Sequence, residues 1–208
     1  MDFEVKYRNE RDVEIPLLLE FIRKHKDIEK ALDVGCARSV YLEKARELIK
    51  IFDCIDIEAD QKASPFLDNY FLGDVIEKDL DIYDLVFAIS VIEHYGVKQK
   101  PASCPLCSQK DMIKKLASLA KKYLFLSFPY GQPYTEPGEF IVISKDKLEY
   151  YLPALKDFNL KIRYYINDNL QAESKWYEVD QFVADASIYD KKYGIRCVCI
   201  VEGIRKDV

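Results

Sequence analysis

Four groups of polar residues and glycines each follow an apolar run in the first half of the chain. They are Asp33–Cys36, Asp56–Ile57, Gly73–Asp74 and Ser90–His94. A carboxylate in such a place can accept hydrogen bonds from ribose hydroxyls, and a glycine lets the backbone approach a ligand closely. Histidine has an ordinary pKa of about 6.5, which suits a general base at neutral pH. Together the four groups predict a nucleoside-binding site beside a candidate base.

A plainer interpretation exists for each group alone. Gly35 can simply turn the chain, Asp56 can be a solvated acid at a strand end, and His94 can be a hydrogen-bonded structural histidine. Glu93 either orients His94 or caps the following turn. Packing alone does not readily explain four such groups in succession, so we expect them to share one edge of a sheet.

The elements that must position these groups alternate between strands and helices. Five apolar runs predict strands at residues 30–34, 52–57, 70–72, 83–89 and 123–128. Helices are predicted by the following apolar positions and signals: Ile15, Leu18, Leu19 and Ile22 with Pro16 in the first turn; Leu42, Ala45, Leu48 and Ile49 with Ser39 as the cap; Met112, Ile113, Leu116 and Leu119 after a loop at 98–109; and a short helix from Lys145 that ends before Pro153.

This alternation predicts an α/β fold with a mainly parallel sheet covered by helices on both faces. Two late apolar runs, at residues 160–166 and 196–201, have no clear helix between them and predict an antiparallel C-terminal strand pair. We expect one domain over residues 1–208. Its parts would be a helical lead-in at 1–29, a cofactor-binding core at 30–128 and an acceptor-side part at 129–208.

The turn after the first strand discriminates between nucleoside cofactors. A dinucleotide needs its pyrophosphate cradled by a G-x-G-x-x-G turn, whereas residues 35–40 read Gly-Cys-Ala-Arg-Ser-Val, with a single glycine. The P-loop pattern is absent as well. S-adenosylmethionine (SAM) carries no phosphate, tolerates a turn with fewer glycines and needs an acidic rim. SAM is therefore the expected cofactor.

Over residues 10–133 the chain resembles the class I SAM-dependent methyltransferases, which have a Rossmann-like fold. Residues 31–36 are similar to the family's first motif, and residues 83–94 are similar to its fourth-strand motif. Residues 128–131, Phe-Pro-Tyr-Gly, resemble the segment that follows the fifth strand. The resemblance implies methyl transfer to an O or N atom of a small-molecule acceptor, and the position of His94 after the fourth strand makes it the expected catalytic base. It implies cofactor contacts by the following residues: Asp33, Gly35, Cys36, Ala37, Asp56, Ile57, Gly73, Asp74 and Ser90.

One departure keeps two alternatives open. The family's first motif usually continues with a second glycine, where this chain has Ala37 and Arg38. A positive φ at Ala37 would be costly. One alternative is therefore a Rossmann-like binding or regulatory protein without catalysis. A nucleotide-linked oxidoreductase is the other, and the single glycine disfavours it.

The composition of the chain indicates which classes of binding partner to expect. The 208 residues are 49% hydrophobic, and the net charge is −5 with basic and acidic residues mixed, so no nucleic-acid partner is expected. The N-terminus has no apolar signal region, and no window has the roughly 20 apolar residues that span a membrane. We expect a cytoplasmic protein without a membrane partner, and a homodimer is a possibility.

The six cysteines raise the question of disulfides and metal binding. Most of the six cysteines are expected to be free thiols. For the Cys104-x-x-Cys107 motif, the alternatives are a free-thiol loop, a disulfide and a zinc site shared with another chain, and we assign no metal ligand.

Residues 10–14, which contain Glu10, Arg11 and Glu14, precede the expected first helix and either fold over the cofactor or are simply solvated. Tyrosines of the last third line an acceptor pocket, or fill the core or a dimer face. His25 is expected at the surface.

Overall fold

The computed structural model describes residues 10–37, 39–60, 62–97, 105–167, 175–191 and 194–206. Ten strands lie within these residues: β1 (Lys30–Val34), β2 (Ile51–Asp56), β3 (Asn69–Leu72), β4 (Tyr83–Ile89), β5 (Ala120–Pro129), β6 (Tyr134–Glu136), β7 (Phe140–Val142), β8 (Phe158–Asn167), β9 (Trp176–Val179) and β10 (Cys197–Arg205). The helices are α1 (Arg11–Lys24), α2 (Leu42–Arg46), α3 (Pro105–Leu119), α4 (Lys145–Tyr151) and α5 (Gln181–Asp185).

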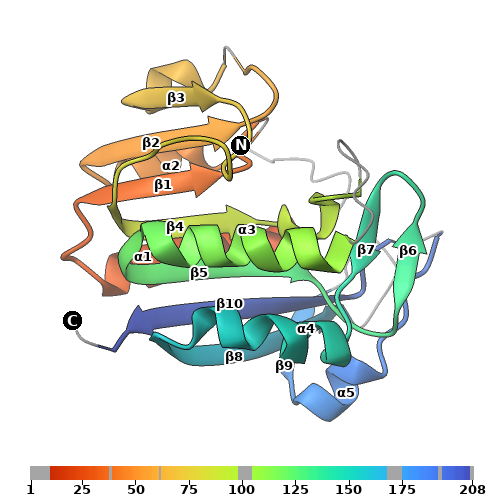
Figure 1. Ribbon diagram of the computed structural model, residues 1–208. Coiled ribbons are helices and arrows are strands. Elements are labelled where there is room, and N and C mark those ends of the chain that lie inside the picture. The colour runs from red at the N-terminus through yellow and green to blue at the C-terminus, as the bar shows by residue number, and fades with distance from the viewer. Residues whose placement is uncertain are drawn as a thin grey trace.

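One sheet organises the molecule. Its eight strands lie in the order β3-β2-β1-β4-β5-β10-β8-β9, and β6 and β7 form a separate hairpin (Figure 1). Strands β1 to β5 pair in parallel, while β10 runs antiparallel to both β5 and β8. The mainly parallel sheet and the antiparallel pairing of the two late strands are both confirmed.

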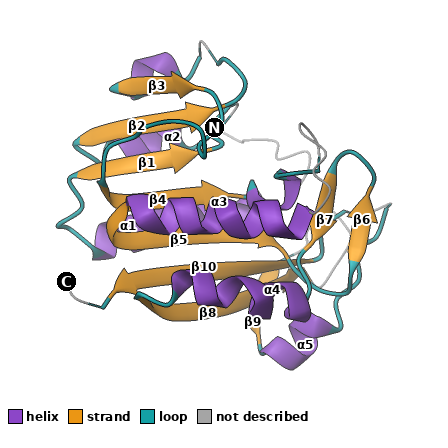
Figure 2. Ribbon diagram, viewed as in Figure 1, coloured by secondary structure: helices purple, strands orange, loops and turns teal. Residues whose placement is uncertain are grey.

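Helices cover both faces of this sheet, as predicted (Figure 2). In strand β4, alternate side chains pack on opposite faces of the sheet. Val86 and Ala88 pack on the side of α3 and α4, whereas Leu85 and Phe87 pack on the side of α1 and α2. Successive side chains of a strand point to opposite faces, so a strand buried on both sides is apolar throughout. This explains the unbroken apolar run at residues 85–89.

Several local predictions were wrong. Pro16 lies in the interior of α1, not in its first turn, because the helix already begins at Arg11. Tyr41, not Ser39, is the residue before α2, which has only five residues. Helix α3 begins at Pro105, so the expected loop at 98–109 is shorter at its C-terminal side. Pro105 suits this first position because its missing N–H would be unpaired there in any case.

Three elements were not predicted: the β6–β7 hairpin, strand β9 and the short helix α5. Strand β9 pairs with β8 and extends the antiparallel side of the sheet to its edge. All three are short, and their sequences lack a long periodic pattern. Among the described residues, no helix has the length and apolar character needed to cross a membrane.

Candidate active site

A cleft with a volume of about 880 Å³ opens at the carboxyl ends of β1, β2, β3 and β4. It brings together most of the residues that the sequence predicted for the site: Gly35, Ala37, Asp56, Ile57, Gly73, Asp74, Ser90 and His94 all line it. Carboxyl ends of parallel strands meet at one edge, so residues that follow each strand converge there. The predicted convergence of the four polar groups is confirmed.

Gly35 follows β1 at the base of the cleft and has a φ of +83°. A Cβ atom added here would overlap the side chain of Val91, which follows β4 on the neighbouring strand. Both the backbone angle and the close approach of the two turns therefore require glycine. Ala37, two residues later, has no such requirement, because Ser90 is the only non-glycine residue with positive φ in the described part of the chain.

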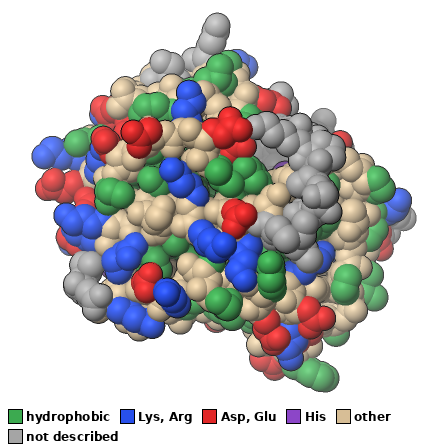
Figure 3. Space-filling view, viewed as in Figure 1, with side chains coloured by type: hydrophobic (Ala, Val, Ile, Leu, Met, Phe, Trp, Pro, Cys, Tyr) green, Lys and Arg blue, Asp and Glu red, His purple; other side chains and the backbone are tan. Residues whose placement is uncertain are grey.

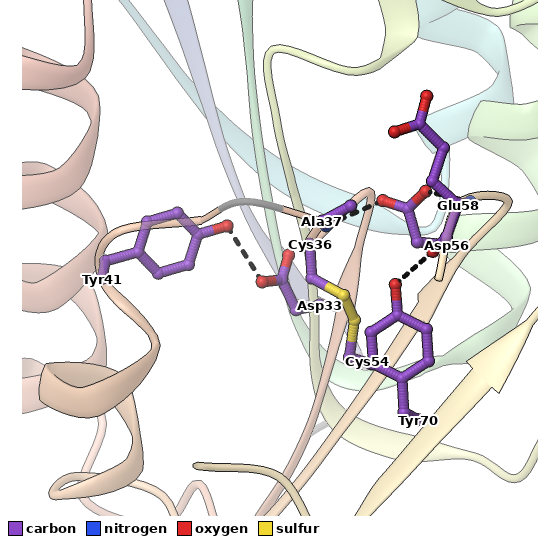
Figure 4. The surroundings of a disulfide bond; sticks show 8 residues. All are labelled: Asp33, Cys36, Ala37, Tyr41, Cys54, Asp56, Glu58 and Tyr70. Atoms are coloured by element: carbon purple, nitrogen blue, oxygen red, sulfur yellow. Dashed lines mark hydrogen bonds between the residues drawn. A yellow bond between two sulfur atoms is a disulfide. The ribbon is translucent and has the colours of Figure 1, made fainter. Parts of the chain in front are cut away.

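Asp56, at the end of β2, ties the turn after β1 to the turn after β2. Its Oδ2 accepts the backbone N–H of Ala37 at 2.8 Å, and its Oδ1 accepts that of Glu58 at 2.8 Å (Figure 4). Tyr70 on β3 supports the same turn by donating its hydroxyl to the Glu58 carbonyl at 2.5 Å. The carboxylate is thus held in place at the cleft wall by groups from two loops.

Asp74 is held in a similar way on the next strand end. Tyr95 donates its hydroxyl to the Asp74 carboxylate at 2.8 Å and 2.9 Å, and Asp74 Oδ1 also accepts the Ile76 N–H at 3.0 Å. Burial and the neighbouring Asp74 carboxylate raise the pKa of Tyr95 well above its ordinary value. The sequence pattern did not identify Tyr95, since it lies one residue beyond the motif that ends at His94.

Asp33 and Cys36 require a correction. Both are completely buried, and neither is among the residues that line the cleft. Asp33 Oδ2 accepts the Tyr41 hydroxyl at 2.9 Å, and burial raises the pKa of Asp33 to about 8. These residues therefore support the cleft wall from behind, because β1 is a central strand whose side chains are covered on both faces.

Cys36 and Cys54 form a disulfide, so the expectation of free thiols was wrong for this pair (Figure 4). Their Cα atoms are 6.2 Å apart, within the usual range for such a bond. Cys197 and Cys199 are free and buried, as expected. Cys104 lies outside the described residues, as does the side chain of Cys107, and no cluster of metal-ligating side chains occurs in the part that is described.

The charged segment at the N-terminal side was expected to be either folded over the cofactor or solvated. Arg11 and Glu14 in fact belong to α1, and Arg11 lines the cleft. Glu14 is fully buried, where it accepts the Ser90 hydroxyl at 2.7 Å and pairs with Arg11 at 2.8 Å. Arg11 also donates to the Ile89 carbonyl at 3.0 Å. The segment is therefore not simply solvated, and α1 is bonded to the end of β4.

Ser90, with a φ of 49°, is the residue through which β4 turns into the cleft. A positive φ is uncommon for a residue other than glycine, and such strain persists only where surrounding contacts hold it. Two hydrogen bonds provide these contacts: the Ser90 hydroxyl donates to Glu14, and the Ser90 N–H donates to the Ser127 carbonyl on β5.

His94 ends the 3₁₀-helix Ile92–His94 and lines the cleft. Its Nδ1 is 2.7 Å from the carbonyl oxygen of Glu139 in the β6–β7 hairpin, and its Nε2 is 3.9 Å from Glu93 Oε1. Glu93 is buried, and burial raises its pKa well above the ordinary value. Gln109, which the sequence did not single out, forms a buried hydrogen bond behind this turn with Tyr151, one of the tyrosines of the last third.

The other histidine, His25, ends α1 and is half-buried, not simply at the surface. Its ring lies against Phe21 and Tyr123, with ring centroids 4.6 Å and 4.3 Å away. Tyr123 lies near the beginning of β5, so His25 is near the amino ends of the parallel strands, whereas the cleft opens at their carboxyl ends.

Comparisons with known proteins agree with this architecture. No protein-family model and no curated protein sequence matches the chain. Among solved structures, it is similar to a magnesium protoporphyrin IX methyltransferase from Synechocystis with bound SAM, at a TM-score of 0.60 and 18% identity, covering 92% of this chain and 78% of that one.

Two further structures show the same similarity. A SAM-dependent methyltransferase from Archaeoglobus fulgidus matches with a TM-score of 0.58 and 18% identity, over 97% of each chain. A 1,6-didemethyltoxoflavin-N1-methyltransferase from Burkholderia thailandensis matches with a TM-score of 0.61 and 11% identity, over 93% of this chain and 79% of that one. The chain therefore has the Rossmann-like fold of the class I SAM-dependent methyltransferases.

Proposed function

We propose that this protein binds SAM in the cleft and transfers its methyl group to an O or N atom of a small-molecule acceptor. The observation that carries the proposal is the position of Asp56 and Asp74, whose carboxylates line one cleft at the ends of neighbouring strands. The similar Synechocystis enzyme has SAM bound, and the similar Burkholderia enzyme has S-adenosylhomocysteine and a small-molecule acceptor bound.

The charge of the cleft supports a cationic, phosphate-free cofactor. Four acidic residues line it, Asp56, Glu58, Asp74 and Glu77, together with one arginine, Arg11. A pyrophosphate would meet like charges on this wall, whereas SAM carries a sulfonium and an ammonium group against one carboxylate. The acidic wall therefore disfavours a dinucleotide and the oxidoreductase alternative.

Asp56 retains hydrogen-bonding capacity for a ribose. Each oxygen of a carboxylate can accept two hydrogen bonds, and Oδ1 and Oδ2 each accept one backbone N–H in the structure. The remaining positions suit two ribose hydroxyls. Apolar side chains, including Ile57, Val75 and Ile76, line the same cleft and suit a purine ring.

SAM, when bound, supplies an electrophilic methyl group, and the protein must position the acceptor and receive its proton. His94 lines the cleft beside the end of β4 and is the side chain best suited to that proton. The neighbouring aromatic side chains of Tyr134, Phe140 and Tyr189 lie within 4.3–6.3 Å of one another, measured between ring centroids. We place the acceptor on this side of the cleft.

The alternative of a binding or regulatory protein without catalysis rested on Ala37 and Arg38. Ala37 does not have a positive φ, so the strain expected at the position where the family's second glycine is missing does not arise. Arg38 lies outside the described residues. On the face seen in Figure 3, Lys and Arg side chains alternate with Asp and Glu, which favours a small acceptor over nucleic acid.

A ligand screen tests the proposal directly. We expect S-adenosylhomocysteine and SAM to raise the melting temperature of the protein, and NAD and NADP to leave it unchanged. A ligand at 100 times its dissociation constant adds about 2.7 kcal/mol of stability, which differential scanning fluorimetry resolves easily. Stabilisation by NAD, or by none of the four compounds, would refute the assignment.

Substitution of Asp56 by alanine is expected to weaken S-adenosylhomocysteine binding by about 1–3 kcal/mol, because the ribose hydroxyls lose their acceptor. Isothermal titration calorimetry measures the change, at a temperature where circular dichroism shows the variant to be folded. Glu58→Gln is the matched control, since it removes one charge from the same wall but leaves the Asp56 carboxylate in place. Equal affinities of Asp56→Ala and Glu58→Gln would show that Asp56 does not bind the ribose.

A further inference from the structure

The β6–β7 hairpin contacts His94 through a turn whose geometry follows from its sequence. Residues 136–139 read Glu-Pro-Gly-Glu, and the Glu139 N–H donates to the Glu136 carbonyl at 3.0 Å. Gly138 has a φ of +74°. Proline at the second position and a glycine with positive φ at the third define a type II turn. The turn sets the orientation of Glu139, the residue whose carbonyl oxygen meets His94.

The partner of Nδ1 determines which nitrogen of His94 carries the proton. A backbone carbonyl oxygen only accepts hydrogen bonds, so at 2.7 Å from the Glu139 oxygen Nδ1 must be the donor. A neutral imidazole has one N–H, and its other nitrogen is then the proton acceptor. Glu93 Oε1, 3.9 Å from Nε2, is beyond hydrogen-bonding distance and does not change this assignment.

The hairpin is well placed to hold this arrangement. The Phe140 ring and the imidazole lie in a T-shaped arrangement, with centroids 6.0 Å apart and planes inclined by 70°. Tyr134 stacks on Tyr189 at 4.3 Å behind the hairpin, and Ile143, just after β7, donates to the Pro129 carbonyl at 3.0 Å. The hairpin lies at the end of the sheet to which the arrowheads of β1, β4 and β5 point (Figure 1).

We infer that the β6–β7 hairpin is a positioning element that holds His94 as its Nδ1–H tautomer, so that Nε2 is the nitrogen that receives the acceptor's proton. The second half of this statement rests on the proposed methyltransferase function. In the transfer, the acceptor atom would form its bond to the methyl carbon as the carbon–sulfur bond of SAM breaks and S-adenosylhomocysteine leaves, and the acceptor's O–H or N–H bond would break. The proton moves to Nε2, and the ring becomes an imidazolium that keeps its Nδ1–H bond to Glu139.

Nuclear magnetic resonance tests the tautomer without any acceptor. The chain has only two histidines, so the long-range ¹H–¹⁵N spectrum of ¹⁵N-labelled protein contains two imidazole patterns, and His94→Gln identifies one of them by its loss. The spectrum is recorded about two pH units above the ordinary histidine pKa of about 6.5, where the neutral ring is observed. We expect a protonated Nδ1 and an unprotonated Nε2. A protonated Nε2 would overturn the inference.

Gly138→Val tests whether the hairpin causes this preference. Nothing lies within 4 Å of an added Cβ at Gly138, so the Cβ itself meets no neighbour and the substitution strains the turn through its positive φ. Gly194→Val is the matched control, because Gly194 also has a positive φ, of +82°, and open space around its Cβ. We expect the Nε2–H tautomer to rise about fivefold or more in Gly138→Val only. An equal response in both variants, or none in either, would overturn the role of the hairpin.

Calorimetry with S-adenosylhomocysteine on the same three proteins separates this inference from the proposed function. Gly138 is not among the residues that line the cleft, so the three affinities should agree. Weaker binding in Gly138→Val alone would show general distortion of the site and overturn the specific role. Absence of binding to the parent protein would refute the methyltransferase proposal, while the tautomer result would still decide whether the hairpin orients His94.

Discussion

Replacing His94 with glutamine is expected to lower the rate of methyl transfer by about 10²–10⁴-fold, the usual contribution of a positioned general base. The acceptor's proton must leave as the new bond to carbon forms, and His94 is the imidazole that lines the cleft. Glutamine has a similar size and can still donate a hydrogen bond to the Glu139 carbonyl, but it cannot take up the proton. The affinity for S-adenosylhomocysteine should therefore be nearly unchanged.

The measurement first needs an acceptor, which a screen of hydroxyl and amine compounds with isotopically labelled SAM can identify. Turnover of the parent protein and of His94→Gln is then compared at saturating concentrations of both substrates. His25→Gln is the matched control, since it removes the other histidine, which lies near the amino ends of the parallel strands. Turnover of His94→Gln within a few-fold of the parent would mean that proximity and desolvation suffice. Loss of cofactor affinity or of folding would instead identify His94 as structural.

Removal of the Cys36–Cys54 disulfide is expected to lower the free energy of unfolding by about 3 kcal/mol. The two cysteines are 18 residues apart, and a cross-link of this length restricts the unfolded chain considerably. The bond also joins the turn that contains Gly35 and Ala37 to β2, two residues before Asp56. We therefore expect weaker cofactor binding as well, since the turn then keeps only its hydrogen bonds to Ile55 and Asp56 of β2.

Urea unfolding of the double variant Cys36→Ala, Cys54→Ala, followed by circular dichroism, measures this change. The parent protein in the presence of a reductant should show a comparable loss. The same reductant added to the double variant is the control, and it should not act through Cys197 or Cys199, which are already free. If the reductant leaves the unfolding midpoint of the parent unchanged, the two sulfurs are not bonded under those conditions.

The sequence alone determined the architecture of the sheet and the edge at which the cleft opens. Both follow from local patterns: apolar runs with strand or helix spacing, and polar residues directly after a strand. Strand β4 was predicted at residues 83–89 with Ser90, Glu93 and His94 following it, and it is observed over Tyr83–Ile89. Parallel strands bring their carboxyl ends together in any such sheet, so Asp56, Asp74, Ser90 and His94 were placed correctly.

Only the tertiary structure decided how these residues are held. Glu14 bonds to Ser90 across 76 residues, His94 meets Glu139 across 45, and Tyr95 reaches Asp74 across 21. It also showed that Asp33 and Cys36 lie behind the cleft wall and that Cys36 pairs with Cys54. A local pattern says on which element a side chain lies, but its partner depends on which distant segment packs against that element. These long-range contacts therefore became visible only in the folded chain.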